Sequence, residues 1–160
     1  MSRRSQVSAG ILAYRRTDGL EFLLAHPGGP LWAKKDAGAW SIPKGLVESG
    51  DLLTCARREF AEETGLATGD DGAFMPLTPV RQKSGKTVHA FAVEANLDLS
   101  DFHSNHFTAE WPPHSGKHRS FPEVDRVAYF PHAAALEKIL TYQRPFIEEL
   151  ARKLGAGEER

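Results

Sequence analysis

The chain has 160 residues, of which 41% are hydrophobic and 26% charged, a composition typical of one globular domain spanning residues 1–160. Its formal net charge is −1, from 20 basic and 21 acidic residues, so no basic field draws it to nucleic acid or to a membrane surface. The single cysteine, Cys55, excludes an intramolecular disulfide, and the apolar run near the N-terminus is too short for a membrane span or a secretion signal. We therefore expect a cytoplasmic protein.

The N-terminal part of the chain predicts a β-hairpin followed by a loop. Residues 6–15 are apolar and rich in β-formers, and residues 21–25 repeat this character after the turn 17–19, which predicts two paired strands. The segment 26–38 is rich in proline, glycine and lysine, which indicates a loop, and a short strand is expected over 39–42.

A helix is predicted over residues 52–64. Asp51 precedes it at the position where an N-cap belongs, and Gly65 follows it as a natural C-cap. Both helix ends are therefore marked in the sequence itself.

The remaining elements follow in the C-terminal half. Strands are expected over 77–83, 86–95 and 124–130, and helices over 131–140 and 145–154. The polar segment 97–120 is either a long loop or a short strand over 107–111 between loops. The order of strands, helix, strands and helices indicates an α+β fold with a mixed sheet between helices.

Three carboxylates lie on one face of the predicted helix. Because an α-helix advances about 100° per residue, Glu59, Glu62 and Glu63 share an arc about 100° wide. An apolar stripe beside them includes Ala56 and Phe60, and it can pack on a sheet while the acids face a groove.

The three acids repel one another, and the nearby cations, Arg57 and Arg58, both lie on their N-terminal side. A divalent cation would relieve this repulsion, and oxygen ligands favour Mg²⁺ or Mn²⁺, whereas no cluster of Cys or His suggests zinc. For the helix alone, a solvated acidic surface is the alternative interpretation.

The segment 45–66 resembles the Nudix box, G-x5-E-x7-R-E-U-x-E-E-x-G-U, where U is an apolar residue. This sequence has G-x5-D-x6-R-E-F-x-E-E-x-G-L, which matches the box position for position from Arg58 to Leu66. In the first half, Asp51 stands where Glu is usual, and one residue is missing before Arg58. Either Asp51 substitutes for the Glu on a shortened loop, or the Glu was lost and Asp51 is its former neighbour.

The resemblance extends beyond the box. Residues 40–45 are similar to the lead-in strand of Nudix proteins, particularly those near the diadenosine polyphosphate hydrolases. Residues 122–130 resemble the late strand before the closing helix, and residues 143–146 resemble small bacterial members. The resemblance implies a Nudix-like α/β/α sandwich with a mixed β-sheet.

Motif positions imply the roles of the box residues. Glu59, Glu62 and Glu63 would hold Mg²⁺, or Mn²⁺, and the backbone carbonyl of Gly45 would add a further oxygen. Glu62 or Glu63 would also act as a catalytic base, and Arg58 would orient the carboxylates by hydrogen bonding.

Residues outside the box complete the expected site. Glu123 is a candidate for a further metal ligand or base, with a surface glutamate as the alternative, and Lys44 is a candidate phosphate contact. Trp32, Trp40 and Trp111 are candidates for stacking on a nucleotide base, although tryptophans are more often packing residues.

The resemblance implies a Mg²⁺-dependent hydrolase of a pyrophosphate bond in a nucleoside diphosphate-linked substrate. Dinucleoside polyphosphates, nucleoside triphosphates and nucleotide sugars all remain open as substrates. The alternative is a catalytically weak Nudix-fold protein that binds a nucleotide or acts as a regulator, which the shortened box favours and the intact acids oppose. The expected partner is a small nucleotide, without nucleic acid or membrane, and the expected state is a monomer or a homodimer.

Overall fold

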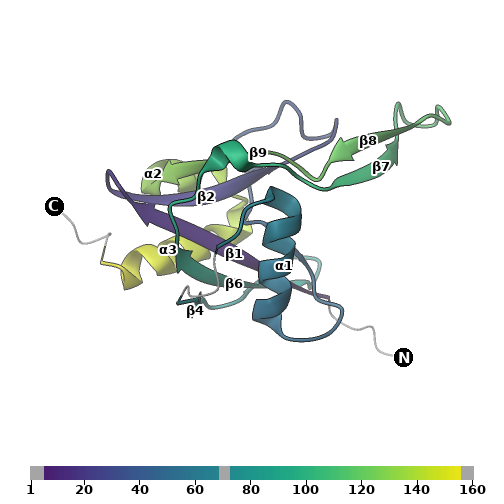
Figure 1. The fold of residues 1–160 in the computed structure, drawn as a ribbon. Coiled ribbons are helices and arrows are strands. Elements are labelled where there is room, and N and C mark those ends of the chain that lie inside the picture. Colours follow the sequence, from purple (N-terminus) through teal and green to yellow (C-terminus); the bar gives the residue numbers. More distant parts are fainter. Residues whose placement is uncertain (1–5, 69–72, 156–160) are drawn as a thin grey trace.

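The computed structural model of the protein describes residues 6–68 and 73–155 (Figure 1). The strands of the main sheet are β1 (Val7–Arg16), β2 (Leu20–Pro27), β3 (Lys44–Leu46), β4 (Met75–Pro76), β5 (Val80–Arg81), β6 (Thr87–Glu94) and β9 (Val124–Pro131). A separate hairpin consists of β7 (His106–Glu110) and β8 (His118–Pro122). The helices are α1 (Leu52–Thr64), α2 (His132–Lys138) and α3 (Arg144–Lys153), with short 3-10 turns η1 (Leu99–Asp101) and η2 (Thr141–Gln143).

Strand β1 lies at the centre of the main sheet, whose order is β4-β6-β1-β2-β9. It runs parallel to β6 and antiparallel to β2, which makes the sheet mixed, as predicted. The segment 41–46 enters between the start of β1 and the end of β2, where Ile11 N–H donates to the Pro43 carbonyl and Ala25 N–H to the Ser41 carbonyl. This insertion separates β1 from β2 and places β3 at the opening between them.

Helices cover both faces of the sheet. Successive side chains of a strand point to opposite faces, so Ile11 packs with Phe60 of α1, while Leu12 packs with Phe146 and Ile147 of α3. Figure 1 shows α1 on one side of the sheet and α2 and α3 on the other. The α/β/α sandwich is therefore confirmed. In the described part of the chain, every helix is too short or too polar to span a membrane.

Several predicted elements are confirmed, among them the β1–β2 hairpin, β9, α2, α3 and α1, whose bounds agree with the prediction. The predicted strand over 39–42 is wrong, because Trp40 and Ser41 form only isolated bridges and the ladder of β3 begins after Pro43. The predicted strand over 77–83 is also wrong in its extent. Pro76 and Pro79 cannot donate backbone hydrogen bonds, and pairing with β6 is limited to the short strands β4 and β5.

The segment 97–120 contains the short strand that was one of its two predicted forms, together with a partner, β8, that was not predicted. Along β7, Phe107 and Ala109 are half-buried, whereas His106, Thr108 and Glu110 are exposed. The hairpin extends away from the main sheet in Figure 1, and its apolar face is turned to other residues of the chain.

Candidate active site

The start of α1 is fixed by Asp51. Its carboxylate accepts hydrogen bonds from the backbone N–H of Thr54 at 2.9 Å and from the Thr54 hydroxyl at 3.0 Å. These bonds hold the pKa of Asp51 below its usual value. The carboxylate therefore caps the helix, and Asp51 does not line the cleft described below.

The rotation of α1 is fixed by the side chains that it buries. Ala56 and Phe60 are fully buried against the sheet, and this orientation leaves the acids on the adjacent face. Glu59 is 18% exposed and Glu62 is 47% exposed, while Glu63 is half-buried. The structure therefore turns Glu59 and Glu63 inward and leaves Glu62 nearer to solvent.

Gly45 lies directly against one of the inner acids. A Cβ atom on Gly45 would be 2.1 Å from Cδ of Glu59 and 2.2 Å from its Oε1, so only glycine fits this position. Strand β3 is held there by its pairing with β1, where Gly45 lies opposite Ala9. The backbone of the box glycine and the Glu59 carboxylate are thus brought together from two separate elements.

A cleft of about 220 Å³ opens beside these residues, and we call it the acidic cleft. Its functional lining comes from β3, α1 and the residue before β9, which supply Lys44, Glu63 and Glu123. Trp32 forms part of the wall. The other lining residues are Ala25, Pro27, Ala39, Ser41, Ile42, Val124 and Leu140.

Glu63 has the most perturbed environment in this cleft. Burial, followed by the charges of Glu59 and Glu123, raises the pKa of Glu63 from 4.5 to about 8, although the charge and backbone N–H of Lys44 oppose this rise. The pKa of Lys44 is lowered by burial and by the charge of Lys86, against the attraction of Glu63. The cleft therefore crowds acidic groups that Lys44 does not fully compensate, and Glu63 relieves this crowding by keeping its proton in the metal-free protein.

Arg58 contacts two of the box acids. Its Nη2 is 3.4 Å from Oε2 of Glu59, and its Nε is 3.7 Å from Oε2 of Glu62. The same Nη2 is 3.5 Å from Sγ of Cys55, which is buried against the sheet. These contacts fit the predicted role of Arg58 in orienting carboxylates.

The donor set fits a hard divalent cation, since Glu59, Glu62 and Glu63 offer carboxylate oxygens and Gly45 offers a backbone carbonyl. The close approach of Gly45 to Glu59 provides a cradle that any side chain would fill. Among the described residues, no three His, Cys, Asp or Glu side chains are yet gathered tightly enough to form a metal site. Binding would thus draw the carboxylates closer together.

The three tryptophans have different positions. Trp32 lines the acidic cleft, as expected of a substrate contact. Trp40 is 4% exposed and packs in the core, with its ring against Phe130, so the structure does not bring it to the cleft. Trp111 follows β7 and lines a second pocket, which Trp32 also lines.

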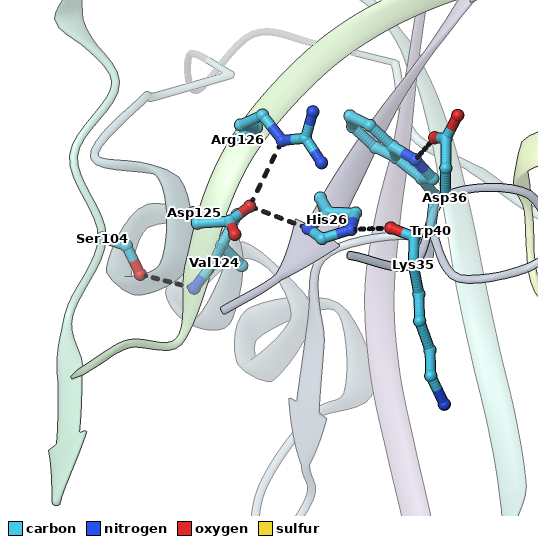
Figure 2. Close-up of polar contacts among 8 residues, drawn as sticks. All are labelled: His26, Lys35, Asp36, Trp40, Ser104, Val124, Asp125 and Arg126. Atoms are coloured by element: carbon cyan, nitrogen blue, oxygen red, sulfur yellow. Dashed lines mark hydrogen bonds and ion pairs between the residues drawn. The ribbon is translucent and has the colours of Figure 1, made fainter. Parts of the chain in front are cut away.

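A buried histidine, absent from the sequence-based site, holds the loop that carries Trp32 (Figure 2). Nδ1 of His26 is 2.8 Å from Oδ1 of Asp125, and Nε2 is 2.6 Å from the backbone oxygen of Lys35. His26 is fully buried at the end of β2, and both of its partners are hydrogen-bond acceptors. The ring therefore connects β9 to the loop 28–39.

Further contacts strengthen this connection. The indole Nε1 of Trp40 donates to Oδ1 of Asp36 at 2.8 Å, and Lys138 pairs with the same carboxylate. Arg126 lies over the Trp40 ring and is 3.5 Å from Oδ1 of Asp125. Since His26 and Asp125 are 99 residues apart, no spacing rule in the sequence could have paired them.

The chain is similar to known proteins in sequence and in fold. The NUDIX domain family profile matches residues 4–150. An uncharacterized 17.7 kDa protein of Enterobacteria phage T4 is 28% identical over 127 residues, covering 78% of this chain and 82% of that protein. A C. elegans Ap4A hydrolase binary complex has a TM-score of 0.63 at 20% identity and covers 92% of this chain and 97% of its own. The NUDIX domain of Shewanella oneidensis NrtR, complexed with ADP ribose, has a TM-score of 0.68 at 16% identity and covers 96% and 90%.

At these identities the solved structures show the fold, while the family profile spans most of the chain. The profile includes the box, the acidic cleft and β9 with its preceding Glu123. The chain belongs to the NUDIX domain family, and the prediction of a Nudix pyrophosphohydrolase is thereby confirmed at the level of enzyme class.

Proposed function

We propose that this protein is a Mg²⁺-dependent hydrolase that cleaves a pyrophosphate bond in a nucleoside diphosphate-linked substrate. The observation that carries the proposal is that Glu63 and Glu123 line one cleft, where the charge of Glu59 also acts on Glu63 and Lys44 is the cation among the described lining residues. An excess of buried negative charge is costly unless a cation compensates it. A divalent cation would supply the compensating positive charge, and it would also bind the phosphates of the substrate.

In this proposal Glu59, Glu62 and Glu63 hold Mg²⁺, or Mn²⁺, with the Gly45 carbonyl. A bound cation of this kind neutralises phosphate oxygens and lowers the pKa of an attacking water. Glu62 is 47% exposed, so its side chain is less confined by packing than those of Glu59 and Glu63. Arg58 keeps Glu59 and Glu62 oriented while they do so.

The proton from water passes to a carboxylate of the cleft. Glu63 and Glu123 are the candidates, because both line the cleft and each acts on the other electrostatically. A carboxylate of the cleft that does not hold the metal would remain free to take this proton, which favours Glu123 when Glu63 is a ligand.

The substrate's phosphates lie beside Lys44, whose side chain lines the cleft next to Glu63. Trp32 contacts the nucleotide from the wall. One structural neighbour is a C. elegans Ap4A hydrolase and another is the NrtR domain in complex with ADP ribose, and both of these nucleotides contain pyrophosphate linkages, which supports a ligand of this chemistry. Dinucleoside polyphosphates and nucleoside triphosphates are the substrates proposed here, and the protein acts as a single cytoplasmic domain.

A substrate panel with Mg²⁺ and with Mn²⁺ tests this function, with wild type compared to Glu63→Gln. We expect wild type to release phosphate or nucleotide only with the metal, and the substitution to lower kcat/KM by about 100-fold or more, as loss of a catalytic base does. Glu148→Gln, an exposed glutamate of α3 on the opposite face of the sheet, is the matched control and should retain full activity. Equal activities of wild type and Glu63→Gln would contradict the proposed site.

A nucleotide-binding regulator without turnover is the second candidate. Asp51 caps the helix, so it does not supply the first acid of the family box to the described lining of the cleft. Tight nucleotide binding, with no metal-dependent turnover of any substrate in the panel, would favour this function over hydrolysis. Sedimentation of the same samples distinguishes a monomer from a homodimer.

A further inference from the structure

A second pocket shares Trp32 with the acidic cleft, and we call it the aromatic pocket. Its volume is about 360 Å³, which is in the range of small-molecule sites. It lies between the loop 28–32 and the hairpin β7–β8, two segments that are distant in the sequence. Its lining residues are Gly28, Gly29, Pro30, Leu31, Trp32, Phe107, Ala109, Glu110, Trp111 and Pro113.

The hairpin supplies one apolar wall of this pocket. Alternate residues of a strand share a face, and Phe107, Ala109 and Trp111 all line the pocket. Phe107 lies opposite Phe121 of β8, with ring centroids 5.8 Å apart, so the two rings pack side by side on one face of the hairpin. The wall is therefore part of a paired structure and not of a free loop.

The loop supplies the opposite wall and lies very close to the hairpin. A Cβ atom on Gly28 would be 2.0 Å from the Pro122 carbonyl oxygen, and one on Gly29 would be 3.1 Å from Cζ of Phe107. The backbone N–H of Gly28 also donates to the Glu123 carbonyl at 2.9 Å. The two glycines thus allow the loop backbone to pack directly against the hairpin.

The pocket has almost no charge of its own. Glu110 is the acid among its described lining residues, and its carboxylate accepts a hydrogen bond from Gly116 N–H at 2.8 Å within the hairpin turn. Leu31, at the pocket, is 71% exposed, the highest value for a large apolar side chain in the described residues. Together with the aromatic side chains, Leu31 makes the lining predominantly apolar, as in most small-molecule sites.

Trp32 lines both the aromatic pocket and the acidic cleft. A single ligand can therefore occupy both, with its charged part near Lys44 and a flat, uncharged part beyond Trp32. Three residues after Trp32, the backbone of the same loop is anchored through Lys35 to His26 and Asp125 (Figure 2). Such an anchored wall loses little conformational entropy when a ligand binds.

We propose that the aromatic pocket binds a nucleobase of the substrate whose phosphates occupy the acidic cleft. A nucleobase is planar, uncharged and joined to phosphate through a ribose, and aromatic side chains stack on any base. The proposal rests on the proposed function for the position of the phosphates. It adds that the hairpin β7–β8, and Trp111 in particular, selects nucleotides over phosphate esters that lack a base.

Equilibrium binding provides the test that does not depend on turnover. AMP and ribose 5-phosphate differ only in the base, and neither contains a pyrophosphate bond, so both remain intact with Mg²⁺. We expect calorimetry on wild type to show AMP binding at least about 10-fold more tightly than ribose 5-phosphate, the size of one stacking interaction. Trp111→Ala should remove this preference, whereas Trp111→Phe, which keeps a ring, should retain most of it.

Phe102→Ala is the matched control, because Phe102 is a half-buried aromatic residue that lines a different surface. It should leave the preference for AMP unchanged. The proposal is overturned if wild type does not distinguish the two ligands, or if folded Trp111→Ala still prefers AMP. In the latter case, a change in oligomeric state of Trp111→Ala would assign the pocket to a second copy of the chain.

The substrate panel separates this proposal from the proposed function. Hydrolysis with metal but without any effect of Trp111 on KM contradicts the aromatic pocket alone. A Trp111-dependent preference for AMP without hydrolysis contradicts the enzyme and supports the pocket. When both hold, Trp111→Ala raises KM for a dinucleoside polyphosphate by about 10-fold and changes kcat much less.

Discussion

Helix α1 and the loop 28–39 face the same cleft from two sides, but different interactions hold them. The helix is capped by its own neighbours, Asp51 and Gly65, and its acids are spaced by helical geometry. The loop has no regular structure of its own, and its position depends on Lys35, Asp36 and their distant partners. One wall is therefore specified locally, and the other is specified by contacts formed only in the complete fold.

This difference predicts how far the structural effect of a substitution extends. A change in the local wall alters the charge or the stability of one helix, and the rest of the sheet is unaffected. A change in the network around His26 releases the loop, and with it Trp32 and one side of both pockets. Three substitutions test this distinction, beginning with the largest expected change in stability.

The first concerns Glu63 in the metal-free protein. Its pKa is about 8 in the folded state against an ordinary 4.5, so folding favours the protonated carboxyl. That contribution is complete below the unfolded pKa and is lost as the pH rises through the folded pKa. Between about pH 5 and about pH 9, the free energy of unfolding of wild type should fall relative to Glu63→Gln by on the order of 3 kcal/mol.

Denaturant unfolding in the presence of a chelator measures this difference. Glu148→Gln should follow wild type at both pH values, since this side chain is exposed on α3. If the difference in unfolding free energy between wild type and Glu63→Gln stays constant across this pH range, the cleft does not raise the pKa of Glu63.

The second substitution is His26→Ala. It leaves the Lys35 carbonyl and the Asp125 carboxylate without their buried partner, and we expect a loss of about 2–3 kcal/mol in the free energy of unfolding. Affinity for AMP should weaken as well, because the loop with Trp32 is no longer anchored. Asp125→Asn, which keeps the shape of the side chain, should lose less of both.

Chemical denaturation and calorimetry on the same samples check this prediction. If His26→Ala loses stability but binds AMP as wild type does, the network supports the fold without positioning the pocket. The two walls would then differ in how they contribute to stability, and the network around His26 would have no effect on AMP binding.

The third substitution is Asp51→Ala, which removes the N-cap of α1. The expected loss is about 1 kcal/mol, typical of a helix cap. Because Asp51 does not line the acidic cleft, kcat/KM should change by less than about 3-fold when the protein is folded. A large loss of activity at unchanged stability would instead give Asp51 the role of the first acid of the family box.

Sequence reasoning predicted the parts that depend on short-range patterns. The helix α1, its caps, the acid face and Gly45 all lie within one segment, and motif spacing alone related them to a Nudix box. Lys44 and Glu123 were placed at the site by resemblance, and both line the acidic cleft.

Other features depend on packing between distant segments. Trp40 and Trp32 look equivalent in the sequence, but Trp40 fills the core beside Phe130 and Trp32 lines the cleft. The strand β8 lacks a strong apolar alternation, and its pairing with β7 becomes visible only in the fold.

The sequence by itself determined the acidic helix, because one turn of an α-helix sets the spacing of its side chains without help from the rest of the chain. The tertiary structure decided which face of that helix opens on a cleft, what lies opposite it, and how the wall that carries Trp32 is held. These depend on the burial of Phe60 and on a hydrogen bond between His26 and Asp125, residues that come together only when β2 and β9 pair.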